Sequence, residues 1–233
     1  MTDIEAALKD LQARTDSTLE ALEQDQRWAE ALELYQLAGA EVDALPIPRD
    51  DPNYKGAYRE AKRVRAYLYL REANALRALG RPGEAAALGE KEVEAAWASG
   101  DMITIARSTF SLGGTCLANG EMERGLKLLD DAKGMFEHGQ GEEFQQGLGW
   151  WYIIQADIRN NGMLPDSPQA TLALADKALE LLRPLKNWPG VARAHAARAK
   201  VYDQLDNAEQ ARLARAAEQM AQGLMHSERA APG

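Results

Sequence analysis

Histidine, cysteine and carboxylate side chains are the groups with which this chain could perform acid–base, nucleophilic or metal chemistry. The sequence holds three histidines, one cysteine and 36 acidic residues. His195 has no carboxylate three or four residues away on either side, so the local sequence offers no metal-binding pair. It contains no phosphate-binding glycine loop, nucleophile elbow, HExxH or CxxC motif. We therefore expect no catalytic residue, no metal and no cofactor, and hence a protein that is not an enzyme.

The charge of the chain argues against two classes of partner. It carries 36 acidic and 27 basic side chains, a formal net charge of −9. The chain has no run of basic residues, so it lacks the positively charged surface with which proteins bind nucleic acids and anionic membranes. The N-terminal residues show no signal-peptide pattern, and no apolar run reaches the roughly 18 to 20 residues that span a bilayer. We expect a soluble cytoplasmic protein that binds neither nucleic acid nor membrane.

Helical hairpins account for nearly all of the sequence. Ala, Leu, Glu and Arg are abundant, and no segment shows the alternation of a β-strand. Glycine, proline and helix-capping residues divide the amphipathic pattern into ten helices. These predict one all-α domain over residues 1–226 and a disordered tail over 227–233. Its five antiparallel hairpins are expected at 3–43, 57–99, 101–137, 142–183 and 190–225.

A proline-rich segment, residues 44–56, separates the first two hairpins. Its three prolines forbid a continuous helix. One interpretation is a long surface connection, and the other is a loop that folds over a binding surface.

A repeated spacing relates the hairpins to one another. The breaks inside successive hairpins, at Gly80, Gly120, Gly162 and Asp206, lie 40, 42 and 44 residues apart. Such a period predicts an α-solenoid, in which each hairpin buries its apolar face against its neighbours.

The best-preserved unit, Ser108–Ala132, resembles the tetratricopeptide repeat. Its matching positions are Leu112, Gly113, Cys116, Gly120, Gly125, Leu129 and Ala132, and those of the last hairpin are Ala199, Tyr202, Asp206 and Ala211. The resemblance implies a right-handed α-solenoid of about five hairpins, with Gly113 and Gly125 as packing contacts. The repeats exceed the family's usual 34 residues and are similar to those of bacterial tetratricopeptide sensors and regulators. Another α-solenoid or an irregular helical bundle is the alternative.

The resemblance also implies where a partner binds, because the first helix of each such hairpin lines a concave groove. The side chains expected to face this groove are more basic and aromatic than the chain as a whole. They are Tyr67, Asn74, Arg77, Arg107, Phe110, Tyr152, Arg159, Arg193 and Lys200, with Leu70, Gly114 and Ala196 beside them.

Some of these residues have roles that the resemblance suggests. Asn74 falls where peptide-binding members of the family hold the backbone of a ligand. Arg107 and Arg193 could bind a carboxylate bidentately, whereas Leu70 stands where one of the family's lysines would be. Arg107 could instead pair with an acidic neighbour such as Glu72.

The aromatic triplet 150–152 supplies a further candidate. Three consecutive residues of a helix, Trp150, Trp151 and Tyr152, cannot all face the core. We expect two of them in the core and the third at an interface, where it could act as an anchor.

These observations support three hypotheses about function. The first is an interaction scaffold that binds a partner segment in its groove, possibly through an acidic stretch or a C-terminal carboxylate. The second is a sensor or regulatory domain for a small molecule or signalling peptide. The third is a self-assembling module, because the end of a solenoid exposes an apolar face and a homo-oligomer would cover it.

Overall fold

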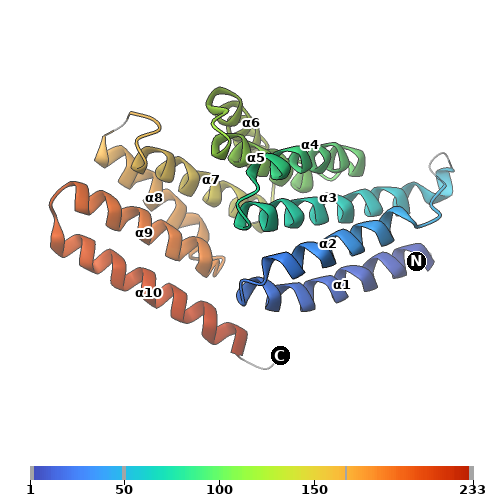
Figure 1. Cartoon of the computed structure of the whole chain (residues 1–233). Coiled ribbons are helices and arrows are strands. Elements are labelled where there is room, and N and C mark those ends of the chain that lie inside the picture. The colour runs from blue at the N-terminus through green and yellow to red at the C-terminus, as the bar shows by residue number, and fades with distance from the viewer. Residues whose placement is uncertain (1–2, 49–50, 166, 231–233) are drawn as a thin grey trace. The chain divides into compact units, whose positions relative to one another are not determined.

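The structure, a computed structural model, describes residues 3–48, 51–165 and 167–230. Over these residues it contains ten α-helices, one short 3-10 helix and no β-strand (Figure 1). The helices are α1 (Asp3–Gln24), α2 (Trp28–Asp43), η1 (Pro52–Tyr54), α3 (Lys55–Ala78), α4 (Pro82–Ser99), α5 (Met102–Ala118), α6 (Met122–His138), α7 (Glu142–Asn160), α8 (Pro168–Leu182), α9 (Trp188–Gln204) and α10 (Ala208–Ala230).

Successive helices pair as the predicted hairpins: α1 with α2, α3 with α4, α7 with α8 and α9 with α10, and α5 with α6 where Gly113 and Gly125 meet. First helices also contact one another, α1 with α3, α3 with α5, and α7 with α9. Within α1–α5 and within α7–α10, each hairpin thus buries one face against the next, as in a solenoid. The prediction of an all-α architecture built of antiparallel hairpins is confirmed.

Contacts between residues divide the chain into two compact units, Met1–Met135 and Phe136–Gly233. Each has its own core. In the first unit Leu8, Tyr35 and Leu68 belong to the largest buried cluster, and in the second Ile153 and Leu182 do. The sequence pattern, which predicts one domain over residues 1–226, carries no signal for this division, because the boundary falls inside α6.

One backbone motif recurs in the turn of every hairpin. The residues Gln26, Gly80, Gly120, Gly162 and Asp206 all adopt a left-handed conformation, with φ between 53° and 82°. In each turn the following N–H donates to the carbonyl five residues earlier, at 2.8 to 3.0 Å. This is the Schellman arrangement, which satisfies the last carbonyls of the first helix. The breaks that the sequence spacing identifies at Gly80, Gly120, Gly162 and Asp206 are therefore equivalent turns.

The backbones of α5 and α6 touch where the sequence predicts small residues. A Cβ atom on Gly125 would lie 2.9 Å from the carbonyl oxygen of Gly113 and 2.7 Å from Cγ of Leu117. A Cβ on Gly113 would lie 3.1 Å from the carbonyl oxygen of Gly125. Both glycines are packing residues, as expected, because a side chain at either position would separate the helices.

Two predicted boundaries are wrong. The segment 227–230, expected in a disordered tail, continues α10 to Ala230. No glycine or proline interrupts this stretch, and helix becomes unfavourable only before Pro232. Residues 231–233 of the expected tail lie outside the described residues. The second wrong boundary is the start of α9. This helix begins at Trp188 rather than at residue 190, because the Asn187 side chain caps it and Pro189 fits its first turn.

The proline-rich segment is shorter than expected. Asp51 caps η1, and α3 follows directly at Lys55, so the last two residues of the predicted loop are helical. Residues 49–50 lie outside the described part of the chain. Leu45 and Ile47 pack against the core of the first unit, so this segment is anchored rather than a free connection.

Candidate functional site

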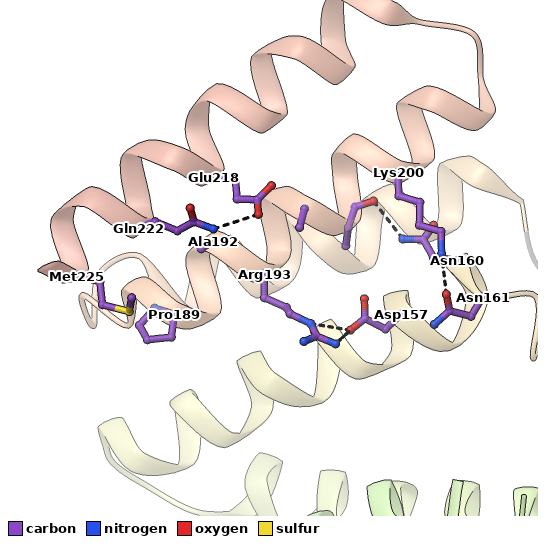
Figure 2. A pocket seen from close by; sticks show the side chains of 12 residues that line it. Asp157, Asn160, Asn161, Pro189, Ala192, Arg193, Lys200, Glu218, Gln222 and Met225 are labelled. Atoms are coloured by element: carbon purple, nitrogen blue, oxygen red, sulfur yellow. Dashed lines mark hydrogen bonds and ion pairs between the residues drawn. The ribbon is translucent and has the colours of Figure 1, made fainter. Parts of the chain in front are cut away.

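A pocket of about 560 Å³ opens in the second unit between α7, α9 and α10 (Figure 2). The first helices α7 and α9 lie side by side, and α10 packs on α9. The residues that line the pocket are Asp157, Asn160, Asn161, Pro189, Ala192, Arg193, Ala196, Ala197, Lys200, Glu218, Gln222 and Met225. Arg193 and Lys200 belong to the predicted groove residues, and Ala196 was expected beside them.

Arg193 and Lys200 lie on the same face of α9, and the helix surface between them is formed by alanines, which we call the alanine floor of the pocket. Arg193 and Lys200 are seven residues apart, so two helical turns, about 10.5 Å, separate their Cα atoms along the axis. Ala196 and Ala197 lie between them, and their short side chains leave the space above the helix open. The sequence thus places one long, positively charged side chain at each end of the alanine floor.

Each cation is held by a polar residue of α7 or of the turn that follows it. Arg193 contacts Oδ2 of Asp157 through Nε at 3.0 Å and Nη2 at 2.9 Å (Figure 2). Lys200 donates from Nζ to Oδ1 of Asn161 at 2.6 Å. The Arg193 side chain is 58% exposed, so its ion pair contributes at most about 1 kcal/mol. A ligand carboxylate could therefore displace or share these partners at little cost.

Asn160 brings a buried acceptor to the same pocket. Its side-chain amide donates from Nδ2 to the carbonyl of Ala197 at 3.1 Å, which links the end of α7 to α9. Its Oδ1 is buried and has no hydrogen-bond partner among the described residues. Buried polar atoms usually find a partner, so this oxygen marks a place where a donor would be favourable.

The wall formed by α10 mixes polar and apolar groups. Gln222 donates from Nε2 to Oε1 of Glu218 at 3.2 Å, and Met225 lies at the end near Pro189 (Figure 2). With two cations, two carboxylates and several amides, the pocket suits a ligand that has both peptide-like and charged groups. It is not a pocket for a purely apolar molecule.

Sequence reasoning missed Asn160 and the α10 residues. In the sequence Asn160 is only the last residue before Asn161 and Gly162, the pair that ends the helix. Its contact partner Ala197 is 37 residues away. The α10 residues belong to a second helix, and the groove prediction considered first helices alone.

The other predicted groove residues of the second unit lie outside this pocket. Arg159 donates from Nη1 to the carbonyl and the Oε1 of Gln155, at 3.0 and 2.7 Å. Tyr152 packs edge-on against Trp151, with the Lys177 ammonium 5.3 Å from its ring centroid. Trp150 and Tyr152 both pack against the core, so the triplet is anchored by its first and third members.

Five predicted groove residues belong to the first unit, and three of them have structural roles there. Arg77 donates to Oγ1 of Thr115 at 3.0 Å and also to Oδ1 of Asn74. Burial lowers the pKa of Arg77. The pair Asn74 and Arg77 therefore joins α3 to α5, and Tyr67 packs against the core beside Arg71.

Arg107 and Phe110 of α5 are partly buried. The acidic residue considered as a partner for Arg107, Glu72, forms its ion pair with Arg65 at 3.0 Å.

The described residues include no group of three or more His, Cys, Asp or Glu side chains that could hold a metal ion. Cys116 is a buried free thiol whose pKa is raised by burial. His195 is also buried, and burial, with Arg198 and Arg183, lowers its pKa to about 4. Within the described part of the chain no helix has the length and apolar character needed to cross a bilayer.

Comparison with known proteins identifies the fold. No protein-family model and no curated protein matches the sequence. The crystal structure of BtubC (BKLC) from P. vanneervenii matches 97% of this chain and 93% of its own, with a TM-score of 0.59 and 13% identity. A putative kinesin light chain from Podosopora anserina with nearly identical TPR-like repeats matches 92% of this chain and 96% of its own, with a TM-score of 0.52 and 17% identity. At these identities the likeness concerns the fold, and this chain is a helical-repeat protein with the tetratricopeptide-like fold.

Proposed function

We propose that this protein is an interaction scaffold whose α7–α9–α10 pocket binds a segment of a partner protein. The observation that carries the proposal is the pair of cations, Arg193 and Lys200, at the two ends of the alanine floor. The proposal concerns a cytoplasmic, non-catalytic protein with protein partners, because the net charge of −9 disfavours nucleic acid.

The spacing of the cations suggests the chemistry of the segment. Residues three apart in an extended chain are separated by about 10 Å, which matches the two turns of α9 between Arg193 and Lys200. A segment with two carboxylates three residues apart would meet both cations, and one of the two could be the C-terminal carboxylate. The remaining nitrogen of Arg193, Nη1, has no partner among the described residues and would be the first donor that a carboxylate meets.

Replacing both cations tests this proposal. We expect the double variant Arg193→Ala/Lys200→Ala to bind an end-labelled acidic peptide with two aspartates three residues apart about tenfold more weakly than the wild type. Fluorescence anisotropy measures the affinity, and circular dichroism verifies that the helix content is unchanged. The matched control is Lys186→Ala/Arg212→Ala, which removes two exposed cations outside the pocket. Equal affinities of the two double variants would reject the pocket as the binding site.

A specific observation also favours self-assembly. On α10 the side chains of Leu213, Met220 and Leu224 are 49%, 70% and 38% exposed and recur at helical spacing. A second copy of the chain could cover this apolar face. Light scattering that shows a monomer at all concentrations would exclude this second function.

A further inference from the structure

A second crevice lies in the first unit, on the side of α3 that faces away from Tyr67 and Asn74. The side chains of Tyr58, Lys62, Arg65 and Tyr69 recur every three or four residues and therefore share one face of the helix. They line a crevice of about 380 Å³ between α3, α4 and the end of α2. A smaller hollow of about 140 Å³ continues from it toward the proline-rich segment. Tyr58, Lys62 and Arg65 line both, so the two form one bipartite groove.

Arg65 lines both parts of this groove, and its side chain is held in place by several contacts. Its guanidinium contacts Asp43 at 3.2 Å and Glu72 at 3.0 Å and lies 3.8 Å from the ring centroid of Tyr69. It fills the space beside Gly39, where a Cβ atom would lie 2.3 Å from Nη1. Because two carboxylates already neutralise Arg65, its role is to shape the groove rather than to bind an anion.

The two other cations of the groove are lysines without a close ion pair. Neither Lys62 of α3 nor Lys91 of α4 forms a hydrogen bond or ion pair within the described part of the chain. The Lys62 ammonium lies 5.5 Å from the ring centroid of Tyr58. The carboxylates Asp43 and Glu94 also line the crevice, so its three cations, Lys62, Arg65 and Lys91, exceed its carboxylates by one charge and leave a local positive field. An anionic group between the two lysines would be complementary.

Four apolar residues line the smaller hollow, beside Asp43, Tyr58, Lys62 and Arg65. They are Val42, Ala61, Leu45 and Ile47, and the last two come from the proline-rich segment. Its volume, about 140 Å³, is close to that of a protein cavity that holds a benzene molecule. One leucine- or phenylalanine-sized side chain would fill it.

We propose that this groove binds a short extended peptide, which places one apolar side chain between Ala61 and Ile47 and a carboxylate between Lys62 and Lys91. The distance along α3 from Ala61 to Tyr69 is about 12 Å, the length of about four extended residues. An apolar residue followed closely by acidic residues therefore spans the groove. The anchored proline-rich segment forms part of this second binding surface, which lies outside the groove residues expected from the repeat pattern.

The test uses the full chain and a defined probe, a fluorescein-labelled, end-blocked hexapeptide of glycines with one leucine followed by two aspartates. We expect saturable binding by anisotropy that weakens as salt is added, because the contacts are partly exposed. The charge-reversal variant Lys62→Glu/Lys91→Glu should bind about tenfold more weakly. The control Lys9→Glu/Lys55→Glu changes the net charge by the same amount at exposed positions outside the groove and should bind within about twofold of the wild type.

Ligand variants test the apolar end without altering the protein. Replacing leucine by alanine in the probe should weaken binding about tenfold, because a cavity-filling side chain is lost. Equal binding by the two charge variants would overturn the proposal, as would full competition by free hexanoate at the same concentration as the peptide. The variant Arg193→Ala/Lys200→Ala, which tests the pocket of the second unit, should leave binding of this probe unchanged, so the two sites can fail independently.

Discussion

Glu92 is a buried carboxyl group whose protonation should make the stability of the fold depend on pH. Its side chain lies on α4 and is completely inaccessible, and neither carboxylate oxygen has a well-formed hydrogen bond among the described residues. Burial raises its pKa to about 8, against the opposing effects of the Ser108 and Ser111 hydroxyls and the Arg77 guanidinium. In the unfolded chain the pKa returns to about 4.3. Between these values the folded state holds a proton that the unfolded state releases.

Stability should therefore fall with rising pH in this window, since the folded state binds more protons than the unfolded one. We expect Glu92→Gln, which is neutral and of the same shape, to remove this dependence. At pH 5 the variant and wild type should differ little, whereas at pH 8.5 the variant should be more stable by at least about 1.4 kcal/mol, the equivalent of one pKa unit. Urea unfolding across pH measures the difference.

Glu94→Gln is the control, because Glu94 lies on the same helix but is exposed. A difference between Glu92→Gln and wild type that stays constant from pH 5 to 8.5 would contradict the buried, protonated carboxyl.

Some residues of the candidate site could be predicted from the sequence, and others could not. Arg193 and Lys200 could be predicted because their spacing on one helix fixes the face they share. The hydrogen bonds that tie Asn74 and Arg77 to α5 could not be predicted, because they depend on Thr115, which is 38 residues from Arg77. Long-range polar partners of this kind leave no periodic signal.

At the scale of the helices, the turns carry most of the information that the sequence provides. Glycine, asparagine and aspartate favour the left-handed conformation that ends a helix, so the hairpin breaks are readable from composition and spacing. Helix ends without such residues are less readable. The start of α9 depends on an asparagine cap, and α10 continues to Ala230 because nothing stops it.

The turn motif leads to a prediction with opposite signs at two equivalent positions. Gly120 has φ of 82°, and a Cβ atom there would meet nothing within 4 Å. Gly120→Ala should therefore destabilise by about 1 kcal/mol through backbone strain alone. Gln26 has φ of 57°, so Gln26→Gly should relieve strain and stabilise by up to about 1 kcal/mol. Thermal unfolding monitored by circular dichroism gives both values.

The matched control is Gly114→Ala, since Gly114 lies inside α5 with open space around it. Alanine is the better helix former there and should stabilise by about 0.5–1 kcal/mol. A destabilising Gly114→Ala, or a change of the same sign at positions 26 and 120, would mean that backbone conformation does not control these turns.

At the scale of the whole molecule, the repeat explains why the fold can be predicted from the sequence and the binding partner cannot. Each hairpin follows the same local rules, so five copies reinforce one interpretation of the architecture. Binding specificity instead depends on exposed side chains that differ from one hairpin to the next. The same chain thus offers the α7–α9–α10 pocket in one unit and the α3 groove in the other, with no sequence motif common to both.

Site-specific crosslinking tests the central proposal, partner binding in the α7–α9–α10 pocket, most directly. A photoreactive amino acid is placed at position 225, which lines the pocket, or at position 212, on an exposed part of α10. We predict that in a lysate of the source organism position 225 crosslinks to a defined protein, that position 212 does not, and that Arg193→Ala/Lys200→Ala abolishes the product. Equal crosslinking from both positions, or a product unaffected by the double variant, would contradict the account.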